Sequence, residues 1–152
     1  MRKFIFMTVA AIFMALPTVA QDINSNPDSI IGEYSTDRGG KKSKVRVTKN
    51  ANGTYTAQVF WVENAFGADG NKRKDVKNPD KSLRNVDIDK VVLVNGLKYN
   101  ASDKSWGGTK IYDPSKGIKV NVEAQFETPD KLRLEGTVLG IGVTLYWNRI
   151  KE

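Results

Sequence analysis

The sequence predicts an all-β domain, and three observations support this. Apolar and polar residues alternate from Ile118 to Phe126 and again from Lys131 to Leu139, which is the pattern of half-buried antiparallel strands. Gly, Asn, Asp and Pro residues, which favour turns, separate these and other short strands. No amphipathic helical pattern of ten residues follows the first 20 positions. Eight or nine short strands of this kind form either a sandwich or an up-and-down barrel.

The remaining expected strands are shorter, and turn sequences separate them. The Asn95-Gly96 pair predicts a hairpin turn because Gly, and to a lesser degree Asn, adopts positive φ readily. Residues Ala51–Gly53 predict another. The strands are expected over Ile30–Ser35, Lys42–Lys49, Thr54–Glu63, Val91–Val94, Gly108–Tyr112 and Val143–Trp147.

The segment from Phe66 to Ile88 has no strand pattern. Asn78 followed by Pro79 predicts a helical turn from Pro79 to Arg84, with Asn78 as the N-cap. A loop this long in a compact domain is usually functional or disordered. The helix start favours an ordered loop.

The first 20 residues are expected to be a signal peptide. Arg2 and Lys3 precede an apolar run from Phe4 to Leu16, and residues 18–20 form a small-residue cleavage site. This apolar run is too short for a transmembrane helix, which needs about 20 residues. No cysteine follows it to carry a lipid anchor. We therefore expect residues 21–152 to form one domain, located in the periplasm or secreted.

The composition excludes several classes of site. The chain carries a formal charge of +7 and contains no His and no Cys, and its three methionines all lie in the expected signal peptide. The remaining chain therefore has no Ser-His-Asp or Cys-His site, no His/Cys zinc site and no cysteine redox centre. No pair of carboxylates, lysines or tyrosines has a spacing that demands a reaction. We expect a protein that is not an enzyme and has no metal or cofactor.

Short motifs in the chain resemble a family of exported bacterial proteins, domain-of-unknown-function family 2147. They run in order through residues 31–149: Ile31-Gly32-Glu33-Tyr34, Asp75, Asn78-Pro79-Asp80, Leu83-Arg84, Gly96-Leu97, Trp106 to Pro114 with Gly117, Leu132 to Gly136, and Trp147-Asn148-Arg149. The resemblance implies an eight-stranded, up-and-down lipocalin-like barrel with one long loop that carries a short helical turn. It also implies binding of a small apolar or amphipathic, lipid-like molecule, and it implies no enzymatic activity.

The same resemblance implies that the barrel is closed at one end by an aromatic residue of the first strand and an arginine of the last. In lipocalin-like proteins the aromatic residue is the Trp of a Gly-x-Trp motif, whereas here the motif reads Gly32-Glu33-Tyr34. The expected pair is therefore Tyr34 and Arg149. A tyrosine ring can still bind a guanidinium through its face.

One face of the expected barrel is a candidate lining for a ligand cavity. An eight-stranded barrel either is filled by its side chains or holds one small ligand, so the same residues are equally consistent with a packed core. Assigning a face from alternation is also sensitive to bulges, since one extra residue reverses it. The candidate lining residues are Val59, Trp61, Val120, Val122, Leu134, Leu145 and Trp147.

The long loop and the Trp106–Tyr112 motif are candidates for the mouth of the barrel. In one interpretation Asn78, Asp80 and Arg84 form a lid, with Arg84 and Lys110 available to an acidic head group. In the other, Asn78 caps the helical turn and Arg84 pairs with a nearby aspartate, so that both only hold the shape of the loop. The candidate mouth residues are Asn78, Asp80, Arg84, Trp106, Lys110 and Tyr112.

Positive charge is concentrated between Asp37 and Lys49, where Lys42, Lys44 and Arg46 share one face of a strand. This basic stripe either contacts anionic lipids, acidic glycans or a protein partner, or is a solvated face that prevents edge-to-edge pairing. The first option gives an alternative function, a non-catalytic interaction module that uses the long loop and the stripe. Nucleic acid is not expected, because the chain has an export signal and no recognisable binding motif. The sequence contains no signal for the oligomeric state.

Overall fold

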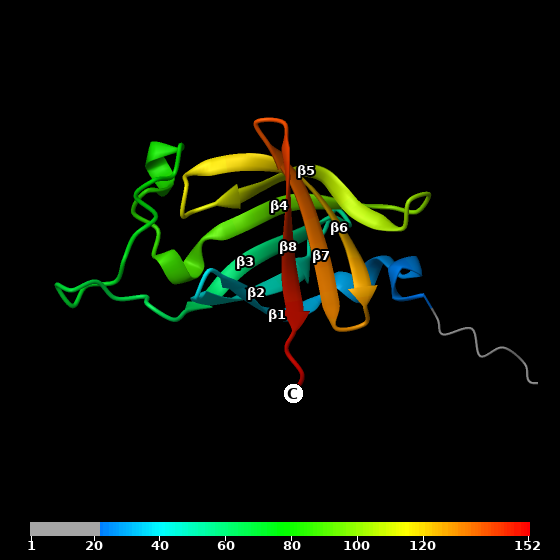
Figure 1. Ribbon diagram of the computed structural model, residues 1–152, viewed down its shortest axis with the longest axis horizontal. Coiled ribbons are helices and arrows are strands. Elements are labelled where there is room, and N and C mark those ends of the chain that lie inside the picture. Colours follow the sequence, from blue (N-terminus) through cyan, green and yellow to red (C-terminus); the bar gives the residue numbers. More distant parts are fainter. Residues whose placement is uncertain (1–21) are drawn as a thin grey trace, which may run out of the picture.

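The computed structural model describes residues 22–152, which form a closed barrel of eight antiparallel strands in chain order (Figure 1). This confirms the up-and-down barrel expected from the sequence. The expected signal peptide lies outside the described residues. The strands are β1 (Gly32–Arg38), β2 (Lys41–Lys49), β3 (Tyr55–Val62), β4 (Val92–Asn100), β5 (Ser105–Asp113), β6 (Ile118–Thr128), β7 (Lys131–Val138) and β8 (Ile141–Arg149).

Two short 3-10 helices, η1 (Ile23–Ser25) and η2 (Pro27–Ile30), cover one end of the barrel. Pro27 at the first position of η2 and the capping side chains of Asp22 and Asn26 favour these turns. The buried Asn24 side chain exchanges two hydrogen bonds with the backbone of Phe126, at 2.8 and 2.9 Å. Ile30, expected in the first strand, instead ends η2 and is fully buried. We call this end of the molecule the closed end.

The core of the barrel is densest at the closed end. Trp106 is fully buried and packs against Tyr99 and Phe126, with ring centroids 5.2 and 5.8 Å apart. Its indole Nε1 donates a 3.0 Å hydrogen bond to the carbonyl of Pro27 in η2. Trp147 packs beside the buried Tyr34 ring at 6.0 Å. Buried aromatic groups that also find polar partners contribute both apolar contact and fixed geometry.

Tyr34 and Arg149 lie opposite each other where β1 pairs with β8. The guanidinium carbon of Arg149 is 5.1 Å from the centre of the Tyr34 ring and 5.2 Å from that of Phe126. Arg149 also donates hydrogen bonds to the carbonyls of Ser29 at 2.6 Å and Ile31 at 3.1 Å. The arginine therefore joins the last strand to the N-terminal turns as well as to the ring.

The strands separate toward the opposite end of the barrel, which we call the open end. β4 and β5 pair only where Lys98–Asn100 face Ser105–Gly107. β1 and β8 pair only through Tyr34 with Arg149 and Ser35 with Asn148. The β7–β8 hairpin consequently leaves the barrel wall and projects from it (Figure 1).

Residues 63–91 form the long connection between β3 and β4 at the open end (Figure 1). It is ordered by isolated bridges between Phe66 and Lys72 and between Lys74 and Asp87, and by two 3-10 turns, η3 (Lys81–Leu83) and η4 (Ile88–Lys90). The expected helical turn is thus shorter than Pro79–Arg84, and its N-cap is Asp80 rather than Asn78.

Two further expectations of local structure were wrong. Asn95-Gly96 is not a hairpin turn but lies within β4, where the register against β3 shifts and Gly96 has a φ of 79°. The positive φ of Gly96 occurs at an irregularity of the strand. Such irregularities favour glycine, as turns do. In β3, the pairing shifts between Lys44–Trp61 and Val45–Val59, so Phe60 is an extra residue. This bulge moves Trp61 to the outer face, where it is 41% exposed.

Candidate functional site

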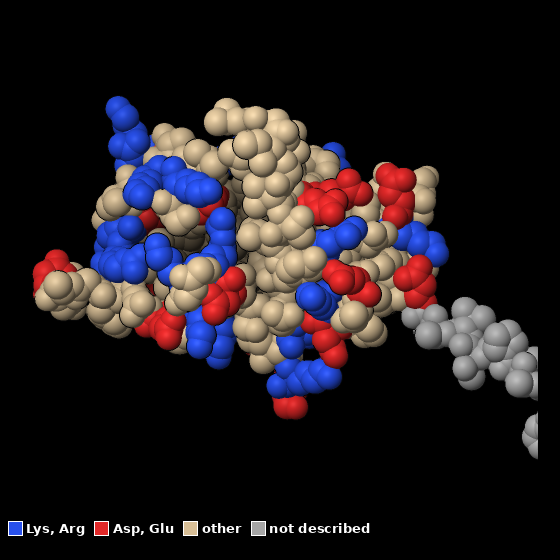
Figure 2. Space-filling view, in the orientation of Figure 1, with Lys and Arg blue, Asp and Glu red and all other residues tan. Residues whose placement is uncertain are grey.

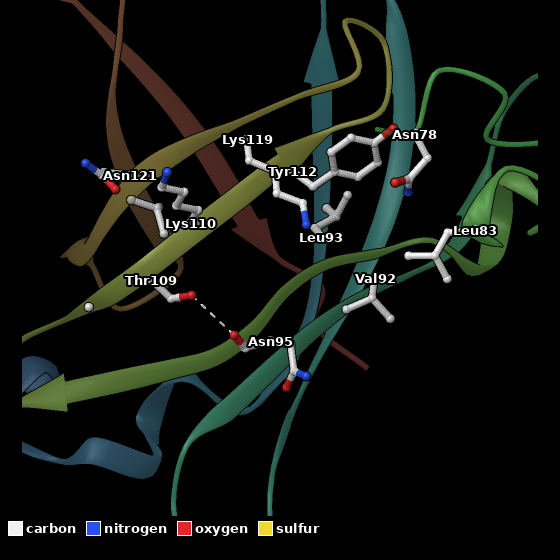
Figure 3. A pocket seen from close by; sticks show the side chains of 12 residues that line it. Asn78, Leu83, Val92, Leu93, Asn95, Thr109, Lys110, Tyr112, Lys119 and Asn121 are labelled. Carbon is white, nitrogen blue, oxygen red and sulfur yellow. Dashed lines mark hydrogen bonds between the residues drawn. The ribbon is translucent and has the colours of Figure 1, made fainter. Parts of the chain in front are cut away.

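A groove of about 790 Å³ lies at the open end of the described chain, where β4 and β5 separate. Its residues come from β4, β5, β6 and the long connection, as Figure 3 shows. A volume of this size lies within the range of about 300–1,000 Å³ that is usual for small-molecule sites. The groove is lined by Asn78, Leu83, Val92, Leu93, Asn95, Gly108, Thr109, Lys110, Tyr112, Lys119, Asn121 and Val122.

The strands diverge next to two glycines in left-handed backbone conformations. Gly96 in β4 and Gly108 in β5 have φ values of 79° and 74°, which side chains other than glycine adopt only with strain. The only hydrogen bond between groove residues across the gap joins the Thr109 hydroxyl to the Asn95 carbonyl at 3.4 Å (Figure 3). The groove is therefore a consequence of backbone geometry and not only of small side chains.

The β5–β6 wall of the groove is polar. Lys110 pairs with Asn121 and Tyr112 with Lys119 in the antiparallel register, so these four side chains share one face of the sheet. Val122 and Leu93 supply apolar surface between the strands, since both pack in or against the core. The groove thus combines an apolar part with a polar, basic wall.

Asp75 fixes the long connection above this wall. The Asp75 side chain is 2% exposed and accepts hydrogen bonds from the Tyr112 hydroxyl at 2.7 Å and from the Asn78 amide at 2.8 Å. Asn78, which is also buried, accepts from the backbone N–H of Asp80, and its carbonyl accepts from Arg84 Nε at 2.7 Å. A buried carboxylate stabilises its surroundings only when such partners are present.

The same contacts determine the protonation state of Tyr112. Burial raises the pKa of Tyr112 well above its ordinary value, and the hydrogen bond to Asp75 and the negative charge of that carboxylate raise it further. Tyr112 is therefore a neutral hydrogen-bond donor throughout the physiological range. Its role here is to hold the long connection in place.

The connection also packs closely on the β5–β6 turn. Lys77 donates a hydrogen bond to the Ser115 carbonyl at 2.8 Å. A Cβ atom at Gly117 would overlap the carbonyl of Lys77, and Gly117 has a φ of 68°. Any other residue at Gly117 would push the connection away from the wall of the groove.

Lys110 and Lys119 give the groove a positive charge. Both side chains belong to exposed residues, and among residues 22–152 neither has a carboxylate within 4 Å. The nearest acidic influence is Asp80, whose pKa is lowered first by hydrogen bonds from Ser82 and, to a smaller extent, by the charge of Lys119. Two unpaired ammonium groups beside an apolar surface can bind an anionic group.

The interior of the barrel offers much less space than the groove. A cavity of about 50 Å³ lies between β5, β6, β7 and β8 near the open end, which is room for only a few water molecules. Among the candidate lining residues, Val120, Val122, Leu134 and Leu145 border this cavity. Val59 and Trp147 belong to the packed core. The interior is thus mostly filled, because large aromatic side chains occupy its closed half.

Several candidate residues lie away from the groove. Trp61 faces outward because of the β3 bulge. Trp106 is buried at the closed end and is not a mouth residue, because the pairing of β5 with β6 shifts between Trp106 and Thr109 and this irregularity turns Trp106 inward, opposite to Lys110 and Tyr112. Asp80 caps η3, and Arg84 binds the Asn78 carbonyl and forms no ion pair with an aspartate within the described chain.

The structure brings the mouth candidates Asn78, Lys110 and Tyr112 and the lining candidate Val122 together in the groove, and it adds residues that were not among the candidates. The sequence signal for Lys119 and Asn121 was their polar alternation in β6, which marked the solvent face of a strand. That face becomes a site only because β4 separates from β5, which alternation does not reveal. The added residues are Leu83, Val92, Leu93, Asn95, Gly108, Thr109, Lys119 and Asn121.

The basic stripe of β2 is partly engaged in local contacts. The Lys44 ammonium lies 5.3 Å from the centre of the Trp61 ring. The Arg46 guanidinium lies 4.5 Å from the Phe60 ring and pairs with Glu33 at 2.7 Å. Within the described chain Arg46 is thus the member of the stripe with an ion pair, whereas Lys42 and Lys44 have no carboxylate within 4 Å.

Two further classes of feature were searched for among the described residues. No group of three acidic side chains lies close enough together there to hold a metal ion. No helix in residues 22–152 has the length and apolar character needed to cross a bilayer.

The comparisons with known proteins agree with the fold. A solved structure described as "Protein HP1028 from the human pathogen Helicobacter pylori belongs to the lipocalin family" is 28% identical, with a TM-score of 0.61, over 80% of this chain and 83% of its own. No curated protein matches the chain. The profile of a family described as "Uncharacterized protein conserved in bacteria (DUF2147)" matches residues 32–149, which comprise the whole barrel. The chain therefore belongs to domain-of-unknown-function family 2147, with a lipocalin-like barrel.

Proposed function

We propose that this protein binds a small amphipathic molecule with an anionic head group, non-covalently, in the groove between β4 and β5. The observation that carries the proposal is the groove itself: about 790 Å³ of space with apolar surface and two unpaired lysines. The lipocalin-like barrel supports small-molecule binding in general. The barrel interior is not proposed as the site, because its cavity of about 50 Å³ is too small for a lipid-like ligand.

The chemistry of the groove indicates how such a ligand would lie. Burying apolar area contributes roughly 25 cal/mol per Å², so an alkyl chain would lie along Leu83, Val92, Leu93 and Val122. A carboxylate or phosphate would then contact Lys110 and Lys119, and Asn121 offers further hydrogen bonds. Asn78 and Tyr112 already satisfy Asp75, so they shape the groove and do not select the ligand.

The cellular setting is part of the proposal. The first 20 residues support export, so the binding would take place in the periplasm or outside the cell. The absence of His and Cys from the whole chain supports a carrier or sensor of its ligand and not an enzyme that transforms it. The alternative function, an interaction module that uses the basic stripe, has weaker support because Lys44 and Arg46 already have local partners.

Native mass spectrometry of the purified protein, followed by solvent extraction, tests whether it carries a ligand from the cell. Titration with a dansyl-labelled fatty acid then tests the site. We expect saturable binding, and a loss of at least about tenfold in affinity for Lys110→Glu combined with Lys119→Glu, because each hydrogen bond to a charged group contributes about 1.5–3 kcal/mol. Asn121→Trp should abolish binding by filling the groove.

Lys151→Glu is the matched control, since Lys151 is an exposed lysine that pairs with Asp130 away from the groove. Circular dichroism should show that all these variants keep the wild-type fold. Repeated absence of bound mass together with no saturable binding of the fatty acid would contradict the proposed function. Binding that is insensitive to both the lysine and the Asn121 variants would place the ligand elsewhere.

A further inference from the structure

The β7–β8 hairpin exposes apolar side chains at its tip. Leu139 is 97% exposed and Ile141 is 69% exposed. Ten consecutive residues, from Val138 to Trp147, carry no charge. Natural sheet proteins usually protect exposed strand edges with charged residues, so an uncharged projecting hairpin indicates that something covers it.

The hairpin stands away from the barrel because β8 has little pairing with β1. In the described chain only Asn148 and Arg149 of β8 have partners in β1, which leaves residues 141–147 unpaired on that side. Leu139 and Gly140 form the turn with φ values of 51° and 78°. Leu139 therefore lies at the tip of the hairpin. Its almost complete exposure shows that its side chain contacts little of the rest of the barrel.

Positive charge lies beside the base of the hairpin. Arg38 and Lys116 border the same opening as Val138 and Val143, and the exposed Lys41 and Lys42 follow Arg38 in the β1–β2 hairpin. Figure 2 shows the uncharged hairpin at the top of the molecule, with mostly Lys and Arg side chains to its left and both acidic and basic side chains to its right.

The acidic groups close to this opening are few and mostly paired. Asp113 binds Arg38 at 3.1 Å, and Glu135 lies 3.3 Å from Arg133. Asp37 accepts a hydrogen bond from the backbone N–H of Gly40. Lys41, Lys42 and Lys116 have no carboxylate within 4 Å in the described chain, so the net charge beside the hairpin is positive.

We propose that the β7–β8 hairpin inserts its tip into the surface of a bilayer that contains anionic lipid, with Lys41, Lys42 and Lys116 contacting the head groups. Apolar side chains enter such an interface to a depth of about 5–10 Å, which suits a tip of one or two side chains. A stable dimer needs about 800 Å² on each partner, far more than Leu139 and Ile141 present. The cations beside the tip complement an anionic surface.

This placement is independent of the groove but compatible with it. The groove, the long connection and the basic residues lie toward the open end, so docking through the hairpin would bring the groove near the lipid surface. The hairpin residues Leu139 and Ile141 do not line the groove. Vesicle binding and ligand binding can therefore fail separately.

The test measures binding of the purified protein to vesicles of phosphatidylcholine with 30% phosphatidylglycerol, and to vesicles of phosphatidylcholine alone. We expect binding to the anionic vesicles that weakens with added salt. Leu139→Ser with Ile141→Ser should reduce it at least tenfold, and Lys41→Glu with Lys42→Glu about fivefold or more for each charge. Ile31→Ser, which removes an exposed apolar side chain at the closed end, should bind as the wild type does.

A single cysteine supplies the reporter, because the chain contains no other. A nitrobenzoxadiazole label at Leu139→Cys should shift its emission to shorter wavelength on anionic vesicles, whereas the label at Ser25→Cys on the closed end should not. Wild-type failure to bind anionic vesicles, or equal binding by the tip variant, would overturn the proposal. So would a change in oligomeric state of the tip variants without vesicle binding, since the hairpin would then contact another copy of the chain.

Discussion

The closed and open ends of the barrel are built by different kinds of interaction. At the closed end, Trp106 packs against Phe126, and Tyr34 packs beside Trp147. Arg149 contacts the Tyr34 and Phe126 rings and joins them to the N-terminal turns. At the open end, the groove is bounded by hydrogen bonds from Asp75 and by the separation of two strands. The difference indicates that apolar packing at the closed end supplies most of the free energy of unfolding. The polar contacts at the open end contribute less to it and keep the groove open.

Replacing the central aromatic residue of the closed end should have the largest effect. Trp106→Ala removes the largest fully buried side chain and its hydrogen bond to Pro27. We expect a loss of about 3–5 kcal/mol in the free energy of unfolding, measured by urea denaturation, because a cavity replaces a large apolar group. Trp61→Ala is the matched control, since Trp61 is half exposed near the open end, and it should cost less than about 1 kcal/mol. Similar losses for both variants would contradict the comparison.

The fold and the site differ in how far the sequence predicts them. The expected strands Ile118–Phe126 and Lys131–Leu139 match β6 and β7 within two residues, because alternation is a local consequence of facing a core. The position of the groove is not local. It depends on where β4 and β5 stop pairing, and the Asn95-Gly96 signal, which resembles a turn, concealed that β4 continues through it.

Side-chain roles show the same division. Alternation places Val122 and Leu134 inside correctly, but the extra residue Phe60 reverses Trp61, and no local pattern marks such a bulge. Asp75 and Asn78 are close in the sequence, but Tyr112 lies 37 positions after Asp75, and the three form one buried hydrogen-bonded cluster. Their presence in the family motifs marked them as candidate residues. It did not reveal that they hold the long connection in place.

Loss of one hydrogen bond at the open end should have an intermediate effect that remains local. Tyr112→Phe leaves the buried Asp75 carboxylate with only its Asn78 partner, and we expect a loss of about 1–3 kcal/mol. Hydrogen exchange should accelerate for amides of residues 72–88, while exchange at the closed end changes little. Tyr146→Phe provides a control at a partly exposed tyrosine. A uniform acceleration over the barrel would show that the connection is not a separate unit.

Moderately alkaline pH should have the smallest effect on the free energy of unfolding, and it acts on tyrosines at both ends of the barrel. Burial raises the pKa of Tyr34 to about 12, against an opposing effect of the Arg149 charge. Burial also raises the pKa of Tyr55 and Tyr112, and the neighbouring carboxylates of Asp28 and Asp75 raise it further. A group whose pKa is higher in the folded state stabilises the fold fully below its unfolded pKa, near 10, and loses that contribution as the pH rises through the folded value.

The free energy of unfolding should therefore show no decrease from these tyrosines up to about pH 9, and should fall by only a few tenths of a kcal/mol per tyrosine at about pH 10. The fall steepens above that pH, because the unfolded chain then releases protons that the folded chain retains. Absorbance at 295 nm measures tyrosine ionisation directly, and urea titrations at each pH measure stability. Tyr34→Phe should flatten the pH dependence by removing one of the three groups. An unchanged slope in that variant would mean that the closed end exposes Tyr34 to solvent more readily than its complete burial and its 2.7 Å hydrogen bond to the Ile30 carbonyl indicate.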